Sequence, residues 1–125
     1  MNVTQNVPLQ SYNSFGIVAK AYSLVRIRSE ADALEVQEHL KNSQEEHCVL
    51  GGGSNIVLTG DVKPLVLKVE ILGKQLVSET DKAWIVEAGA GENWHELVTW
   101  TLQQGWPGLE NLALIPGSVG ASPVQ

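Results

Sequence analysis

The sequence predicts an α+β domain made of two small α/β subdomains. Its first half contains strand, helix and strand signals, and its second half contains a hairpin, a helix and a long loop. Elements grouped in this way are typical of α+β folds, whereas α/β folds alternate strand and helix throughout. With 43% hydrophobic and 18% charged residues, the 125-residue chain has the composition of a folded domain. We place the subdomains at residues 1–70 and 71–125.

The first subdomain is expected to contain one helix between strands. Ser29 stands where a helix N-cap is favoured, and Asp32 follows three residues later in a weak capping-box spacing. The helix should run to about Asn42 and bury Ala33, Val36 and Leu40. Strands are expected at residues 21–27, 47–50, 56–58 and 65–69.

The second subdomain is expected to open with a hairpin. Residues 75–79 and 83–90 favour strands and flank a short polar turn. Asn93 is expected to cap a second helix, and Gly105 to follow its C-terminal end. The inward stripe of this helix should comprise Trp94, Leu97, Val98, Thr101 and Leu102.

Composition and charge argue against several classes of protein. A net charge of -6 argues against a surface for nucleic acid or anionic membranes. The chain has no apolar run long enough to span a bilayer, and its N-terminus lacks the pattern of a signal peptide. The single cysteine, Cys48, favours the cytoplasm and is expected to be buried and inert. His39, His47 and His95 lack metal-ligand spacing, so no metal site is expected.

A run of three glycines between two strands is the first candidate site. Gly51, Gly52 and Gly53 let a ligand approach bare backbone, whose N–H groups can converge on an anion, while Ser54 and Asn55 add polar contacts. The run lacks the lysine of a Walker A loop and leads into a strand, unlike a Rossmann fingerprint. A tight interstrand turn and a diphosphate site therefore both remain open.

The C-terminal stretch is the second candidate site. It is punctuated by glycine and proline yet strongly apolar, which suits either a buried crossover loop or a surface for a flat aromatic ring. Two loops of this kind in one small domain favour a dinucleotide ligand.

Four motifs in order carry a resemblance to a known family. They are Asn13-Ser14-Phe15-Gly16, Gly51-Gly52-Gly53-Ser54-Asn55, Gly89-Ala90-Gly91-Glu92-Asn93-Trp94-His95 and the stretch from Gly108 to Gln125. Together they resemble the UDP-N-acetylenolpyruvoylglucosamine reductase family, flavoenzymes of peptidoglycan synthesis. The resemblance covers essentially the whole chain, and the last motif, Ile-Pro-Gly-Ser-Val-Gly-Ala-Ser-Pro-Val-Gln, is the most specific.

The resemblance implies an FAD-binding domain of the p-cresol methylhydroxylase/vanillyl-alcohol oxidase type. It assigns the diphosphate to the turn at 51–55 and the flavin and ribityl chain to the C-terminal loop. It also implies NADPH as hydride donor and reduction of the enolpyruvyl group of UDP-N-acetylglucosamine enolpyruvate to the lactyl ether of UDP-N-acetylmuramate. The cofactor-binding residues it implies in that loop are Ile115, Pro116, Gly117, Gly120, Ala121, Ser122, Val124 and Gln125.

The same resemblance implies that the catalytic machinery lies beyond this sequence. The family motif continues past Gln125, and its catalytic serine, arginine and glutamate come further on. We therefore expect a truncated FAD-binding part with no catalytic residue, no substrate-binding domain and no turnover by itself. Another FAD oxidoreductase of the same fold, or a non-catalytic nucleotide-binding module, are the alternatives.

Overall fold

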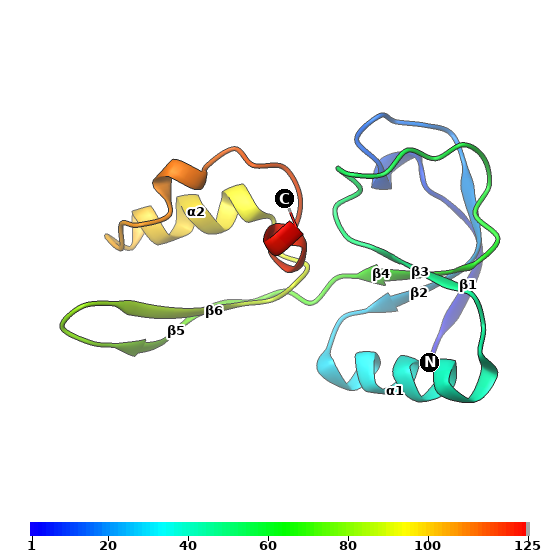
Figure 1. The fold of residues 1–125 in the computed structure, drawn as a ribbon, viewed down its shortest axis with the longest axis horizontal. Coiled ribbons are helices and arrows are strands. Elements are labelled where there is room, and N and C mark those ends of the chain that lie inside the picture. Colours follow the sequence, from blue (N-terminus) through cyan, green and yellow to red (C-terminus); the bar gives the residue numbers. More distant parts are fainter. Residues whose placement is uncertain (125) are drawn as a thin grey trace.

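The computed structural model describes residues 1–124, which form two lobes side by side (Figure 1). The first lobe holds a four-stranded sheet in the order β1-β2-β4-β3, made of Val3–Pro8, Lys20–Ile27, Leu65–Val69 and His47–Leu50. β1 is antiparallel to β2, while β2, β4 and β3 run parallel, with Leu24 beside Val66. The carboxyl ends of the three parallel strands therefore point to one edge of the sheet.

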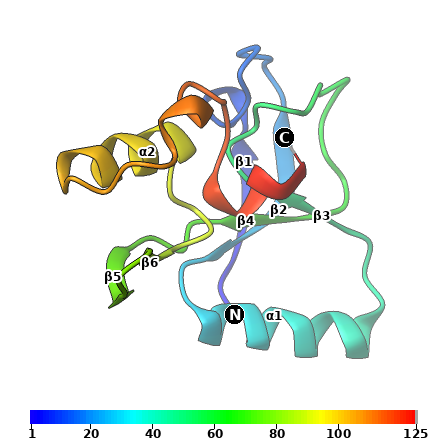
Figure 2. The same cartoon turned by 60° about the vertical axis from the view of Figure 1, so that its left-hand side comes forward.

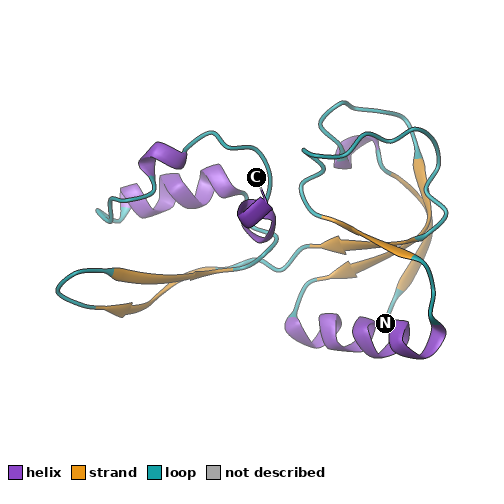
Figure 3. Ribbon diagram, in the orientation of Figure 1, coloured by secondary structure: helices purple, strands orange, loops and turns teal. Residues whose placement is uncertain are grey.

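Side-chain alternation along the strands builds a core on each face of this sheet. α1 (Glu30–Ser43) covers one face, where Val36 packs with residues of β2 and β4 (Figure 3). Loops before β2 and after β3 cover the other face, with Leu9, Ile56 and Leu58 packed against Leu24. Ser29 caps α1 as expected, since its side chain accepts a hydrogen bond from the Asp32 N–H at 3.1 Å.

Three sequence-based expectations for this lobe need correction. β1 was not predicted, because its sequence is largely polar and only Val7 is buried. Residues 56–58 form no strand: Ile56 and Leu58 pack onto the core from a loop, and β4 takes the place beside β3. Cys48 is exposed rather than buried, because β3 is an edge strand, although partial burial of its thiol still raises its pKa.

The second lobe consists of a hairpin and a helix, as expected. β5 (Lys74–Glu79) pairs with β6 (Trp84–Ala88), and α2 (Trp94–Gln103) follows. The Asn93 side chain caps α2 by accepting from the Glu96 N–H at 3.0 Å, and Gly105 follows its C-cap with φ 81°. Leu97, Val98 and Thr101 are buried as expected, but Leu102 is 44% exposed.

The chain beyond α2 returns toward the first lobe. A short 3-10 turn at Glu110–Leu112 packs on α2, and a second at Val119–Val124 ends the described chain. Two views place this last turn between α2 and the loops of the first lobe (Figure 1, Figure 2). No helix within residues 1–124 combines the length and the apolar character needed to span a membrane.

A tight crossing of two segments joins the lobes. The Gly91 N–H donates to the Ile71 carbonyl at 2.8 Å, and the Gly89 N–H donates to the Gly73 carbonyl at 2.8 Å. A Cβ on Gly91 would lie 2.8 Å from the Glu70 backbone, and one on Gly89 would lie 2.2 Å from the Ile71 oxygen. Neither position has room for a side chain, so the crossing sets how closely the lobes approach.

We expect Gly91→Ala to lower the free energy of unfolding by about 1–3 kcal/mol, because its methyl group meets backbone that cannot rotate away. Gly60→Ala is the matched control, since nothing lies within 4 Å of a Cβ there. Urea denaturation of both variants measures the difference. Equal midpoints for the two variants would contradict the steric argument.

Candidate functional site

The two glycine-bearing loops singled out in the sequence meet in space. The first follows the carboxyl end of β3, and the second runs from α2 back toward the first lobe. A Cβ on Gly52 would lie 3.3 Å from Gly117 Cα, and one on Gly51 would lie 3.0 Å from the Ser118 Oγ. Beside this contact lies a cleft of ≈ 320 Å³. Its lining residues are Ser14, Gly52, Ser54, Gly91, Asn93, Pro116, Gly117 and Ser118.

Glycine is required at the base of the first loop. Gly53 has φ 71°, and a Cβ there would lie 1.8 Å from the Tyr12 carbonyl oxygen. The Gly53 carbonyl accepts a hydrogen bond from the Ser14 N–H at 3.1 Å. The buried Asn13 orders this neighbouring segment by accepting from the Ile17 N–H and donating to the Leu9 carbonyl, both at 2.9 Å.

The first loop has backbone donors that are not used within the protein. Among residues 1–124, the N–H groups of Gly52, Gly53 and Ser54 have no protein acceptor within hydrogen-bond distance. Convergent N–H groups in a glycine turn bind anions, and they can bind a diphosphate without a side-chain cation in direct contact with it. A nucleotide diphosphate therefore fits this cradle, where any Cβ on Gly51 or Gly52 would crowd the opposite loop.

Lys68 of β4 stands behind the same turn, a feature that the sequence reasoning missed. Its Nζ donates to the Gly51 carbonyl at 2.6 Å and lies 5.4 Å from the centre of the Tyr12 ring. Burial is the main factor that lowers the pKa of this ammonium group. Lys68 thus fixes a carbonyl away from the cleft and places a positive charge near the free N–H groups.

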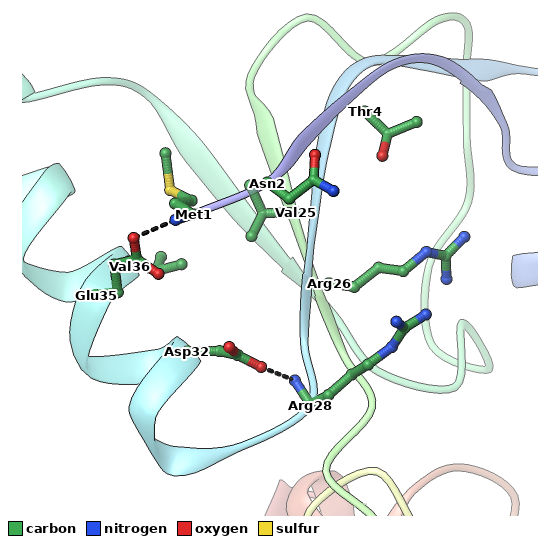
Figure 4. A pocket seen from close by; sticks show the side chains of 9 residues that line it. All are labelled: Met1, Asn2, Thr4, Val25, Arg26, Arg28, Asp32, Glu35 and Val36. Carbon is green, nitrogen blue, oxygen red and sulfur yellow. Dashed lines mark hydrogen bonds and ion pairs between the residues drawn. The ribbon is translucent and has the colours of Figure 1, made fainter.

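A second hollow, of ≈ 410 Å³, lies between β2 and α1 but is charge-balanced (Figure 4). The Asp32 carboxylate accepts from the Arg28 N–H at 2.8 Å, and the Met1 amine pairs with Glu35. Glu70 holds the guanidinium groups of Arg26 and Arg28, at 2.5 Å and 3.2 Å. With its charges paired inside the protein, this hollow offers an anion less than the smaller glycine-lined cleft.

The second loop is held along its length by the segment before α2. The Gly117 carbonyl accepts from the Trp94 N–H at 3.0 Å, and the Val119 N–H donates to the Glu92 carbonyl at 2.8 Å. The Gly120 N–H donates to the Ala90 carbonyl at 2.9 Å. A Cβ on Gly120 would lie 2.9 Å from the Ala90 Cβ, so glycine is needed for this close approach.

The structure brings together some of the residues selected from the sequence. Gly52, Ser54, Pro116 and Gly117 line the cleft. Gly51 and Gly53 form the turn behind it. The others lie outside the lining: Asn55 and Val124 are exposed, Ile115, Ala121 and Ser122 are half-buried, and Gly120 packs on Ala90. Gln125 lies outside the described residues.

Four lining residues were not selected from the sequence: Ser14, Gly91, Asn93 and Ser118. Ser14, Gly91 and Asn93 belong to the recognised motifs, so motif membership was the available signal. Ser118 lies within the selected loop but was passed over. Its backbone forms an isolated antiparallel bridge with Asn93, which places Ser118 at the cleft.

Glu92 is a buried carboxylate between two residues that line the cleft, Gly91 and Asn93. Its Oε1 accepts from the Gly73 N–H at 2.7 Å, and its Oε2 accepts from the Lys74 Nζ at 2.9 Å. These bonds, first that from Lys74 and then that from Gly73, lower the pKa of Glu92. Glu92 therefore ties the start of β5 to the segment that supports the second loop.

The residue set of the cleft suits an organic anion better than a metal ion. Within residues 1–124, no three His, Cys, Asp or Glu side chains gather as metal ligands would. The cleft itself presents hydroxyls, one side-chain amide and backbone. Such a site can hold and orient a phosphate-bearing ligand, and its lining contains no carboxylate, imidazole or amine.

Comparisons with known proteins agree with this geometry. The model of an FAD binding domain family matches residues 22–125. The UDP-N-acetylenolpyruvoylglucosamine reductase of Azoarcus sp. (strain BH72) is 53% identical over 127 residues, covering 98% of this chain and 37% of the relative. That of Dechloromonas aromatica (strain RCB) is 50% identical over 125 residues, covering 100% of this chain and 36% of the relative.

A solved structure is also similar. The crystal structure of UDP-N-acetylenolpyruvylglucosamine reductase from Thermus caldophilus matches with a TM-score of 0.66 and 28% sequence identity. The match covers 97% of this chain and 41% of that one. The resemblance noted in the sequence is thus confirmed, and the chain spans about a third of the length of the curated relatives it matches.

We expect Glu92→Gln to lower the free energy of unfolding at neutral pH by about 1.5–3 kcal/mol, the usual contribution of a hydrogen bond to a charged group. Because the pKa of Glu92 is lowered by folding, its stabilisation is present above the unfolded-state value and is lost as pH falls through the lower folded-state value. The gap between variant and wild type should therefore narrow in acid.

Urea denaturation from neutral pH down through the acid range measures this gap. Glu38→Gln, at an exposed position on α1, is the control and should track the wild type at every pH. A gap for Glu92→Gln that stays constant into strong acid would count against a charged role for Glu92.

Proposed function

The chain belongs to the FAD-binding domain family, and from that premise we propose that it is the cofactor-binding part of a UDP-N-acetylenolpyruvoylglucosamine reductase. The α+β fold and the FAD cofactor expected from the sequence are confirmed by the family match and the structural neighbour. The observation that carries the proposal is the meeting of Gly51–Asn55 with Pro116–Ser118 at one cleft, in a chain about half identical to reductases of that name.

The residues at the cleft suit FAD in a specific way. We assign the diphosphate to the free N–H groups of Gly52, Gly53 and Ser54, with the charge of Lys68 behind them. The wall formed by Pro116 and Gly117 then supports the part of the cofactor that extends toward α2. We assign residues 1–70 and 71–125 to the two subdomains that hold the cofactor between them.

The reaction proposed for the whole protein is the NADPH-dependent reduction of UDP-N-acetylglucosamine enolpyruvate to UDP-N-acetylmuramate. Bound FAD would supply the hydride carrier between NADPH and the enolpyruvyl double bond. The residues described above would hold and orient this cofactor. We assign proton transfer and substrate binding to the part of the relatives that this chain does not span.

A cytoplasmic location belongs to the same proposal. The sequence has one cysteine, Cys48, so it cannot form a disulfide within the chain. Its thiol is exposed, and a reducing compartment is the simplest one for an exposed free thiol.

Substitutions at Ser54 test the assignment of the diphosphate. We expect Ser54→Asp to weaken FAD binding by about tenfold or more, because a carboxylate in the cleft repels the diphosphate. Ser54→Ala should weaken it less, since it removes only a hydroxyl. Ser78→Asp adds the same charge at an exposed position of β5 and should leave affinity unchanged. Quenching of FAD fluorescence measures all three, and similar affinities for the two aspartate variants would reject the assignment.

A chimera tests the activity. We expect this chain, joined to the remaining part of the Azoarcus sp. relative, to oxidise NADPH over many turnovers only when UDP-N-acetylglucosamine enolpyruvate is present to reoxidise the flavin. The chain alone should bind FAD, measured by the visible absorbance of the flavin, and show no such turnover. A flavin-containing chimera that oxidises NADPH regardless of the sugar would favour another flavin oxidoreductase. A chain that binds no flavin would favour a different nucleotide-binding module.

A further inference from the structure

Two neighbouring side chains at the start of α2 hold the loop that leads into the cleft. The Trp94 Nε1 donates to the Leu112 carbonyl at 2.7 Å. The His95 Nδ1 accepts from the Leu114 N–H at 3.1 Å. The Trp94 backbone N–H adds a third bond, to the Gly117 carbonyl at 3.0 Å. Two consecutive residues thus fix the loop backbone at three points, which we call the α2 clamp.

The residue in the middle of the clamp has a strained backbone. Leu114 has φ 64°, in the left-handed region that L-residues other than Asn and Asp rarely adopt. Its side chain is 78% exposed, so burial of that side chain in a core does not explain the conformation. Strain of this kind persists where surrounding contacts impose it, and it is concentrated at functional sites. Here the imposed contacts are the side-chain bonds from Trp94 and His95.

The strained residue lies two positions before the wall of the cleft. Ile115 separates Leu114 from Pro116 and Gly117, which line the cleft opposite Gly52. The position of this wall therefore depends on the path of the chain through Leu114. A loop released at Leu114 would still be anchored at Gly117, but the segment between them would be free to rearrange.

The chemistry of the His95 contact is also specific. The Leu114 N–H donates to Nδ1, so this contact uses the lone pair of that nitrogen and the imidazole acts as a hydrogen-bond acceptor. The side-chain oxygen of asparagine can take the place of Nδ1 as an acceptor close to the backbone. Leucine has comparable bulk but no acceptor, so these two substitutions separate the hydrogen bond from packing.

We propose that Trp94 and His95 are positioning residues of the cofactor site, acting through the backbone of Leu114 to set the wall at Pro116 and Gly117 against the glycine turn. This inference rests on the proposed function, since that wall belongs to the cleft assigned to FAD. Neither side chain is needed to contact the cofactor, because the effect travels through the loop.

Amide hydrogen exchange and FAD titration together test the clamp. In His95→Leu, the peptide covering residues 112–118 should exchange about tenfold faster without ligand, and FAD binding should weaken by a similar factor. Trp94→Phe removes the indole donor and should act in the same direction. His95→Asn keeps an acceptor and should stay within about twofold of the wild type in both measurements. His47→Leu, at an exposed histidine of β3, is the matched control and should change neither.

The outcomes separate this inference from the proposed function. A wild-type chain that binds no FAD overturns both. If the wild type binds FAD and His95→Leu binds it equally well, the inference alone is overturned, whether or not the loop exchanges faster. Weaker binding in His95→Leu that His95→Asn fails to restore also overturns it, since the acceptor is then not what matters. Far-UV circular dichroism and urea midpoints confirm that each variant compared is folded.

Discussion

Residues 70–73 and 89–92 cross with no space for a side chain at Gly89 or Gly91, and this contact determines where everything in the second lobe lies. The Gly91 N–H donates to the Ile71 carbonyl, and the Glu92 carboxylate holds Gly73 and Lys74 on the other side of the crossing. Since α2 begins at Trp94, two residues after Glu92, the crossing also sets the start of α2. Gly89 and Gly91 thus serve to bring the two lobes together.

The same crossing explains how an acidic protein can present a site for an anion. Residues 90–94 hold the second loop through backbone hydrogen bonds. The glycine turn lies at the carboxyl edge of the parallel strands of the first lobe. The N–H groups of Gly52, Gly53 and Ser54 have no protein acceptor among residues 1–124, and the Lys68 ammonium group binds the carbonyl of the adjacent Gly51. Because the donors are backbone groups, the net charge of -6 does not oppose binding of a diphosphate at this one point.

Local signals predicted the elements well, while contacts between distant segments were out of reach. Ser29 and Asn93 identified both helix starts because a cap is a local hydrogen bond. β1 was missed because an edge strand need not show apolar alternation. The burial of Cys48 was predicted wrongly because the position of β3 at the edge depends on the whole sheet, which local sequence does not reveal. The glycine turn could be selected from the sequence as a site. The contact of Lys68 with Gly51 could not, because it depends on the pairing register of β3 and β4.

Cofactor affinity in this chain should depend on how the two lobes are placed relative to each other. The wall at Pro116 and Gly117 has no extensive core of its own: it is held by α2 through Trp94 and His95, and α2 is held by the crossing at Gly91 and Glu92. A disturbance at the crossing would therefore reach the cleft through rigid elements rather than through a flexible loop. A substitution that removes the Ser29 cap of α1, on the far side of the first sheet, would lower the free energy of unfolding with little effect on the cleft. The same loss at the crossing would separate the two halves of the site, because the loop that carries the wall is hydrogen-bonded to residues 90–94, which follow the crossing.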